Sequence, residues 1–198
     1  MKKLLLLLFC FPTLAMAQLT AIPNTNFELA LIALGYDVLP LNGSVPTANI
    51  NTVTTLDVSD ENIYDLKGIE DFVALIDLDC SLNHYLVNIL LHNNTLLQTL
   101  DFSWCDLNSI NLLNNTALTW IDGSAQGVGA NTNSGLDTID VSNCLLLNYL
   151  DISHNELSYL DVTNNIYLQK LDAYSNDIDN LDVTQNGWLT HWIAVVII

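Results

Sequence analysis

The feature that most constrains this chain is a short pattern, LxxLD or a close variant, that returns at an almost constant spacing. It begins at residues 53, 75, 97, 118, 147, 168 and 189, with intervals of 22, 22, 21, 29, 21 and 21 residues. A fixed period of this length is typical of solenoids, in which each repeat buries its apolar faces against its neighbours. We therefore expect a stack of coils over residues 53–198.

The alternation of side chains within one unit predicts a short strand with one buried face. In the unit that begins at Leu147, the apolar Leu150 and Ile152 flank the polar Asp151. Repeating this every 21 or 22 residues stacks the strands in parallel, about 4.8 Å apart. Only about ten residues remain for the rest of each unit, which is too few for an ordinary helix, so we expect a short second strand or 3₁₀ turns there.

The full unit follows LxxLxLxxNxL and resembles the leucine-rich-repeat family. Leu147, Leu150, Ile152, Asn155 and Leu157 match every marked position. The first unit is similar to the 22-residue internalin type, and later units resemble the short repeats of secreted bacterial surface proteins. The resemblance implies a leucine-rich-repeat solenoid with a parallel β-sheet on its concave face. It also implies interaction or adhesion, usually without catalysis.

Polar amides recur at the point where each unit leaves its strand. Asn83, Asn155 and Asn176 occupy this position. An amide turned inward can satisfy backbone groups that the strand ladder does not reach. We expect these side chains to be buried.

The two ends of the chain predict export and capping. Residues 1–17 have the charged start, short apolar run and small-residue cleavage site of a signal peptide, so we expect a secreted or cell-surface protein. The apolar run is shorter than the roughly 20 residues of a membrane span, and no membrane span is expected in the mature chain.

Residues 18–52 predict an N-terminal cap with a helix over about 24–34. The apolar end after Trp188 has no polar cap, so either the solenoid continues or this edge docks onto a partner; we favour a solenoid truncated at this end.

The charge of the chain excludes several classes of partner. Four lysines stand against 22 acidic residues, and loss of Lys2 and Lys3 with the signal peptide would take the net charge from −18 to −20. Such a surface repels phosphate, so nucleic acids and anionic membranes are poor partners. Cationic partners and divalent cations are favoured.

Neither cysteines nor histidines indicate a reactive or metal centre. The spacing of Cys80, Cys105 and Cys144 does not match a zinc site, and we expect all three to be buried as small hydrophobic residues. An odd number of cysteines would also fit one disulfide with a free thiol, or an intermolecular disulfide. The four histidines show no HExxH spacing, and no GxSxG is present. We therefore expect no enzyme and no firm cofactor.

One acidic position recurs in six units and lies on the exposed face of the predicted sheet. The residues are Asp57, Asp79, Asp101, Asp122, Asp151 and Asp172. Stacked carboxylates repel, and solvation, raised pKa values or bound cations such as Ca²⁺ would relieve the repulsion. The alternative is that aspartate merely keeps an exposed strand soluble. Asp140, Asp161 and Asp182 form a shorter second column.

Aromatic residues accompany this Asp column. Trp120 and Tyr149 occupy the third position of their units, Trp104 the eighth and Tyr174 the seventh. Aromatic residues flanked by acids suit a protein interface or a platform on which sugars stack. With Asp101, Asp122 and Asp151 they form the ligand-binding face that we expect, for a protein or glycan at the cell surface. The competing hypothesis is a structural, calcium-stabilised spacer within a larger surface protein, with no ligand of its own.

The glycine-rich stretch GVGANTNSG, residues 127–135, is an inserted loop rather than a phosphate site. Its unit has 29 residues where the next has 21, so eight are extra. A dinucleotide fingerprint needs a helix immediately after the glycines, and here the apolar pattern of the repeat resumes at Leu136, Ile139 and Val141.

Overall fold

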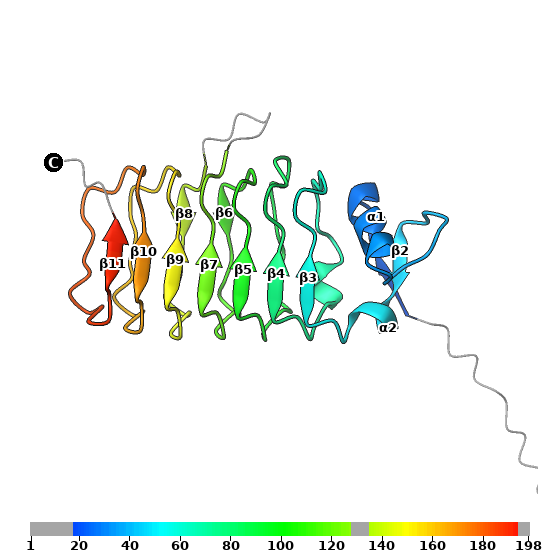
Figure 1. The fold of residues 1–198 in the computed structure, drawn as a ribbon, viewed down its shortest axis with the longest axis horizontal. Coiled ribbons are helices and arrows are strands. Elements are labelled where there is room, and N and C mark those ends of the chain that lie inside the picture. The colour runs from blue at the N-terminus through cyan, green and yellow to red at the C-terminus, as the bar shows by residue number, and fades with distance from the viewer. Residues whose placement is uncertain (1–17, 128–134, 194–198) are drawn as a thin grey trace, which may run out of the picture.

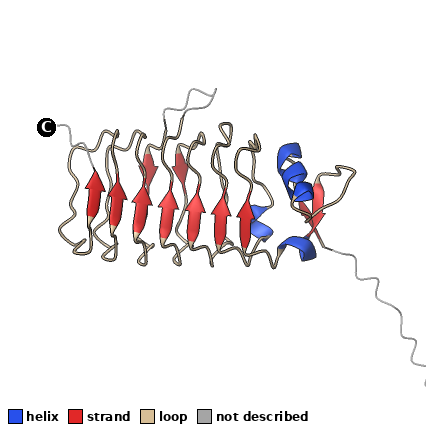
Figure 2. Cartoon of the chain, viewed as in Figure 1, coloured by secondary structure: helices blue, strands red, loops and turns tan. Residues whose placement is uncertain are grey.

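In a computed structural model, residues 18–127 and 135–193 form a solenoid of parallel strands with a small N-terminal cap (Figures 1 and 2). Residues 1–17, for which the sequence predicts a signal peptide, residues 128–134 of the glycine-rich loop and residues 194–198 lie outside the described residues. The main sheet has seven strands in the described part of the chain. They are β3 (Thr55–Asp57), β4 (Asp77–Asp79), β5 (Thr99–Asp101), β7 (Trp120–Asp122), β9 (Tyr149–Asp151), β10 (Lys170–Asp172) and β11 (His191–Ile193).

Each strand of this sheet is three residues long, and all but β11, whose three residues are exposed, keep one side chain inside. In β3 to β10 the middle residue is a leucine or isoleucine that is almost fully buried, and its two neighbours point outward. Neighbouring strands are parallel and pair without a shift, so that Leu56 lies beside Leu78 and Leu78 beside Leu100. The predicted solenoid and its parallel sheet are confirmed.

The opposite side of the solenoid contains only short elements, as the small number of residues there predicts. A 3₁₀ turn, η1 (Ile69–Asp71), follows the first strand, and β6 (Ser109–Ile110) pairs in parallel with β8 (Thr138–Ile139). Leu136, Ile139 and Val141 are all buried, so the apolar pattern does resume directly after the inserted loop. In Figure 1, β6 and β8 lie behind the main sheet.

A compact cap covers the N-terminal end of the solenoid. It consists of an antiparallel pair, β1 (Leu19–Ala21) and β2 (Ser44–Pro46), with α1 (Thr25–Ala33) and the single turn α2 (Thr47–Ile50). The Asn24 side chain accepts a hydrogen bond from the Phe27 N–H at 3.0 Å and so begins α1. Phe27 then stacks against Phe72, with ring centroids 6.3 Å apart, and this contact joins the cap to the first repeat.

A ladder of buried amides runs along the main sheet at the position that the sequence predicts. The Asn155 Nδ2 donates to the carbonyls of Gly123 and Ile152, both at 3.0 Å, and its Oδ1 accepts from the Leu136 N–H at 2.9 Å. Asn83 and Asn176 repeat this arrangement in their own units. Each amide therefore connects two coils and satisfies three backbone groups.

A second ladder, which the sequence analysis does not anticipate, lies where the back of each unit turns toward the next strand. Asn165 Nδ2 donates to the carbonyls of Val141 and Cys144, and Asn186 Nδ2 donates to those of Val162 and Asn165. The signal was present in the sequence, because an Asn or Cys precedes each of the last five repeats by three residues.

The three cysteines of the described chain are free and buried, which confirms their expected role as small core residues. Burial raises the pKa of Cys105 to about 12 and that of Cys144 to about 11, so both remain neutral thiols at physiological pH. No helix among residues 18–127 and 135–193 is long and apolar enough to cross a membrane.

Candidate binding surface on the sheet

The outer face of the main sheet carries two columns of side chains, one from the first and one from the third residue of each strand. The parallel register places the members of each column side by side. The first column contains Thr55, Asp77, Thr99, Trp120, Tyr149, Lys170 and His191. The second, which we call the Asp column, contains Asp57, Asp79, Asp101, Asp122, Asp151 and Asp172.

Each carboxylate of the Asp column holds the turn that ends its own strand. Asp122 Oδ1 accepts from the Ser124 N–H at 3.0 Å and from the Ser124 hydroxyl at 2.7 Å. The same pair of bonds recurs from Asp57 to Asp151, and Asp172 accepts from the backbone of Tyr174. Among the described residues, no three His, Cys, Asp or Glu side chains are grouped so that they could hold a metal ion. The hydrogen bonds to the turns give the Asp column a structural role in ending each strand.

The central members of the Asp column are nevertheless electrostatically strained. Burial raises the pKa of Asp101 and of Asp122 above the usual value, and their acidic neighbours add to the rise, while the hydrogen bonds from Ser103 and Ser124 oppose it. A carboxylate with a raised pKa binds protons more tightly in the folded chain than in the unfolded chain. Its ionisation therefore destabilises the fold as the pH rises through the folded pKa.

We expect Asp122→Asn to leave stability at pH 7 unchanged or to raise it by up to about 1 kcal/mol, because the amide oxygen still accepts from Ser124 and the like charges are removed. Asp122→Ala should lower stability by about 1 kcal/mol, since the turn loses its acceptor. Urea unfolding at pH 7 and below pH 4 checks both, because any gain from asparagine should vanish where the wild-type carboxyl is protonated. A gain that persists at low pH would contradict the electrostatic explanation.

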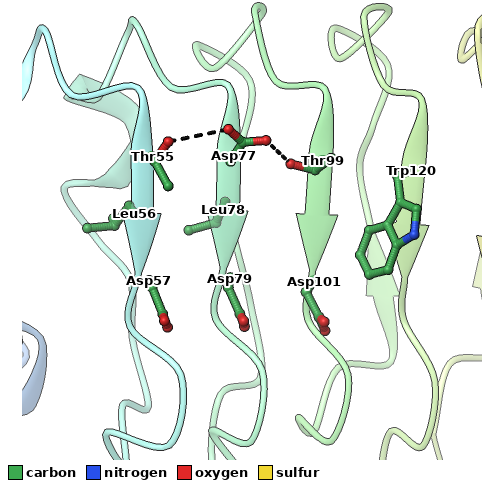
Figure 3. Close-up of a pocket in the computed structure, with 9 residues that line it drawn as sticks. All are labelled: Thr55, Leu56, Asp57, Asp77, Leu78, Asp79, Thr99, Asp101 and Trp120. Carbon is green, nitrogen blue, oxygen red and sulfur yellow. Dashed lines mark hydrogen bonds between the residues drawn. The ribbon is translucent and has the colours of Figure 1, made fainter.

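The N-terminal half of the sheet face forms a shallow acidic depression of about 360 Å³ (Figure 3). Asp77 lies at its upper side and accepts hydrogen bonds from the hydroxyls of Thr55 and Thr99, one on each neighbouring strand. Asp57, Asp79 and Asp101 line the lower side. Figure 3 also shows the Trp120 ring at one end of the depression, between β7 and β5. The depression therefore combines carboxylates with one aromatic wall.

Beyond Trp120 the first column continues as an aromatic stack. The rings of Trp120 and Tyr149 are nearly parallel, at 17°, with centroids 4.9 Å apart. Lys170 Nζ lies 4.6 Å from the centroid of the Tyr149 ring and 3.4 Å from its hydroxyl. These contacts hold both rings in one orientation before any partner arrives.

The other two predicted aromatic residues lie at the strand ends, apart from this stack. Trp104 is 47% exposed and has a positive φ of 58° in the turn after β5. Its carbonyl lies 2.9 Å from Nδ1 of His84, and no ring contact joins it to Trp120. Tyr174 meets the edge of His154, with centroids 5.4 Å apart. The structure therefore brings together two of the four predicted aromatic residues and leaves the other two on the border of the same face.

The sequence places Lys170 on the same face as the aromatic residues, but it predicts neither the contact of Lys170 with Tyr149 nor the depression beside Trp120. Aligning the third position of every unit would have placed Thr55, Asp77 and Thr99 in one row with the aromatic residues. The sequence also contained a signal for the structural role of the Asp column. A Ser follows five of its six members by two residues, which is the spacing of a side-chain turn.

No family model matches the sequence, and no curated protein matches it either. Solved structures do. An internalin (inlF) from Listeria monocytogenes superimposes with a TM-score of 0.62 at 22% identity, over 89% of this chain and 57% of that one. Internalin C2 of the same organism gives 0.57 at 15% identity, over 91% of this chain and 99% of that one.

The fold is that of an internalin-like leucine-rich-repeat protein. A leucine-rich-repeat protein from Leptospira interrogans has the same architecture, with a TM-score of 0.56 at 16% identity over 78% of this chain and 40% of that one. The chain spans little more than half the length of the inlF internalin and less than half of the Leptospira protein. At these identities the internalin-like architecture is what the proteins share, and the binding chemistry has to be argued from the residues of this chain.

Proposed function

We propose that this internalin-like chain is an exported protein-binding module that recognises a basic segment of a partner through the outer face of its sheet. The observation that carries the proposal is the stacked pair Trp120 and Tyr149 beside the acidic depression. Asp101, Asp122 and Asp151 flank the stack, and Trp104 and Tyr174 border the face. Residues 1–17 add export to the proposal, and the surface implies recognition rather than catalysis.

The charges favour a cationic partner over a neutral one. Asp101 and Asp122 already have raised pKa values, so a Lys or Arg side chain placed between them relieves a repulsion that exists in the free protein. A neutral sugar can stack on a tryptophan but leaves the carboxylate charges uncompensated. A guanidinium group can stack on the Trp120 ring and pair with a carboxylate at the same time.

The aromatic pair meets the usual requirements of an interface anchor. Tyr and Trp supply large contact areas, and they are enriched among residues whose truncation costs most binding energy. Here both rings are half-buried and already oriented by their stacking and by Lys170, so little side-chain freedom is lost on binding. The serines at the strand ends donate their hydroxyls to the Asp column, which gives them a structural role rather than that of nucleophiles.

The test is to select binders of the folded chain from a random peptide library and to measure one selected peptide against variants. We expect the selected peptides to be rich in Lys and Arg, and their affinity to fall with added salt. Changing Trp120 and Tyr149 together to Ala should weaken binding at least about 30-fold, as expected when an anchor worth roughly 2 kcal/mol is lost.

The matched control replaces two exposed tyrosines outside the sheet face, Tyr64 and Tyr159, with Ala. This control should bind as the wild type does. Peptides without basic residues, equal binding by the Trp120 and Tyr149 variant, or preferential binding of neutral oligosaccharides would each contradict the proposal.

A further inference from the structure

A second surface lies along the edge of the solenoid where the chain turns into each strand. Five four-residue turns begin at residues 94, 115, 144, 165 and 186, and each ends at the core leucine that opens the next repeat. In every turn the N–H of the last residue donates to the carbonyl of the first, at 3.0 to 3.2 Å. The two middle residues project outward. Figure 1 shows these turns in a row at the lower ends of the strands. We call residues 95–96, 116–117, 145–146, 166–167 and 187–188 the turn rim.

The turn rim is unusually apolar for its backbone conformation. The middle positions of tight turns normally hold Gly, Pro, Asn, Asp or Ser. Here six of the ten are large hydrophobic residues that are about half exposed or more: Leu96, Leu145, Leu146, Ile166, Tyr167 and Trp188. Their exposure contributes nothing to the core. A row of exposed apolar side chains on neighbouring coils indicates a contact surface.

The turn rim is also free of charge, although the chain has a net charge of −18. No Asp, Glu, Lys or Arg occurs at residues 93–100, 114–121, 143–150, 164–169 or 185–193. A second copy that approached the Asp column would meet like charge, and so would one that approached the Asp140, Asp161 and Asp182 column. A copy that approached through the turn rim would bury apolar side chains without opposing carboxylates. The charge distribution thus favours another copy of this chain at this edge.

The sizes of the side chains fit a two-fold arrangement. Consider two copies whose turn rims pack antiparallel, with the two-fold axis at Leu145 and Leu146. The small residues Thr116 and Ala117 of one copy then face the large Ile166 and Tyr167 of the other. Likewise Gly187 beside Trp188 faces Thr95 and Leu96. Six half-exposed side chains at about 100 Å² each offer roughly 600 Å² per copy, somewhat below the roughly 800 Å² per partner of a standard interface. We propose that the turn rim is a homodimer interface with its two-fold axis at Leu145 and Leu146.

The first test is the mass of the chain in solution, measured by sedimentation from micromolar to submillimolar concentration. We expect a monomer–dimer equilibrium, and we expect Leu146→Asp to weaken the dimer by about a hundredfold or more, because two carboxylates then meet at the axis. Leu146→Asn, which suits a turn and carries no charge, should weaken it less. Position 146 is exposed, and circular dichroism verifies that both variants fold. A wild-type chain that stays monomeric, or a Leu146→Asp chain that dimerises unchanged, would overturn the proposal.

The second test fixes the register by oxidative cross-linking. Leu146→Cys should form a covalent dimer, because the two copies of position 146 meet at the axis. Leu96→Cys is the matched control, since its two copies would lie about four strand spacings apart, roughly 19 Å. Cys80, Cys105 and Cys144 are buried and should not react. Equal cross-linking of the two variants would overturn the two-fold register.

Salt and vesicles separate this proposal from the other occupants of such a surface. Added salt should strengthen the dimer, because it screens the repulsion between two acidic copies, whereas it should weaken binding of a basic peptide to the sheet face. Dimerisation through the turn rim and peptide binding to the sheet face can therefore be tested separately, and the absence of one does not imply the absence of the other. Sedimentation of the monomer with neutral phosphatidylcholine vesicles, abolished by Leu146→Asp, would overturn the dimer in favour of a lipid surface.

Discussion

Asn155→Ala is expected to lower the free energy of unfolding by about 4 kcal/mol, the largest effect of any substitution considered for this chain. The amide donates to the carbonyls of Gly123 and Ile152 and accepts from the N–H of Leu136, which lie in three different segments. The Ile152 carbonyl also accepts from Asn176 at 2.8 Å and the Gly123 carbonyl from Gln126 at 3.4 Å. Alanine leaves the buried Leu136 N–H unpaired, at a cost of about 1 to 3 kcal/mol, and removes one hydrogen bond from each carbonyl, at about 0.5 to 1.5 kcal/mol each. Some of that cost is offset where water enters the space.

The prediction is checked by urea unfolding, with Asn165→Ala and Asn164→Ala as comparisons. Asn165 belongs to the second ladder and donates to two carbonyls, each of which also accepts from a backbone N–H, so its loss should cost less, about 1 to 2 kcal/mol. Asn164 is exposed and makes one long bond of 3.5 Å to the carbonyl of Ser142, so its removal should cost less than about 0.5 kcal/mol. If Asn155→Ala were as mild as Asn164→Ala, the ladder would not hold the coils together.

Gly123→Val is expected to destabilise the chain by about 3 kcal/mol, although valine or isoleucine is normal at this position of the repeat, as at Val58 and Ile152. The reason is the neighbouring coil. A Cβ at position 123 would lie 2.3 Å from Cζ and 2.8 Å from Cε2 of Phe102, whose ring is completely buried. The ring has no free space to move into, so a larger side chain must distort the packing.

Phe102→Val should rescue the Gly123 substitution. Alone, Phe102→Val leaves a cavity and should cost about 2 to 3 kcal/mol. In the double variant the new valine fills part of that cavity, so the combined loss should be smaller than the sum by at least about 2 kcal/mol. Thermal or urea unfolding of the two single variants and the double variant completes the cycle. Additive losses would show that the two positions do not compete for the same volume.

The sequence predicted the architecture well because a solenoid depends on local rules repeated at a fixed period. Each unit needs one inward side chain per strand, an amide at the turn and an apolar back half, and all three are visible in residues 147–168. The internalin-like fold and the parallel sheet follow from this repetition. The β1–β2 pair and α2 of the cap were not predicted, because the cap occurs once and no period reveals its pairing.

The candidate site was predicted in position but not in geometry. Register alone places Trp120 and Tyr149 in adjacent strands, even though the inserted loop separates them by 29 residues. Register does not say that the rings stack, that Lys170 covers Tyr149, or that Trp104 stays outside the stack. Those outcomes depend on side-chain rotamers and on the positive φ of the turn residues, which are decided by neighbours in space.

By itself, the sequence of this chain determined which residues face inward, which face outward and which coils are neighbours, because alternation and period are properties of the linear pattern. Only the tertiary structure decided how each pair of neighbours fits. The absence of a side chain at Gly123 leaves the space that the Phe102 ring fills, a fit that no linear pattern reveals. The Asp column appears in the sequence as a row of exposed charges, and in the structure its carboxylates also accept the hydrogen bonds of the turns. The leucines of the turn rim appear as ordinary repeat residues, yet they project into solvent. The physical reason is that volume, hydrogen bonding and exposure belong to contacts between coils, and these exist only after the chain has folded.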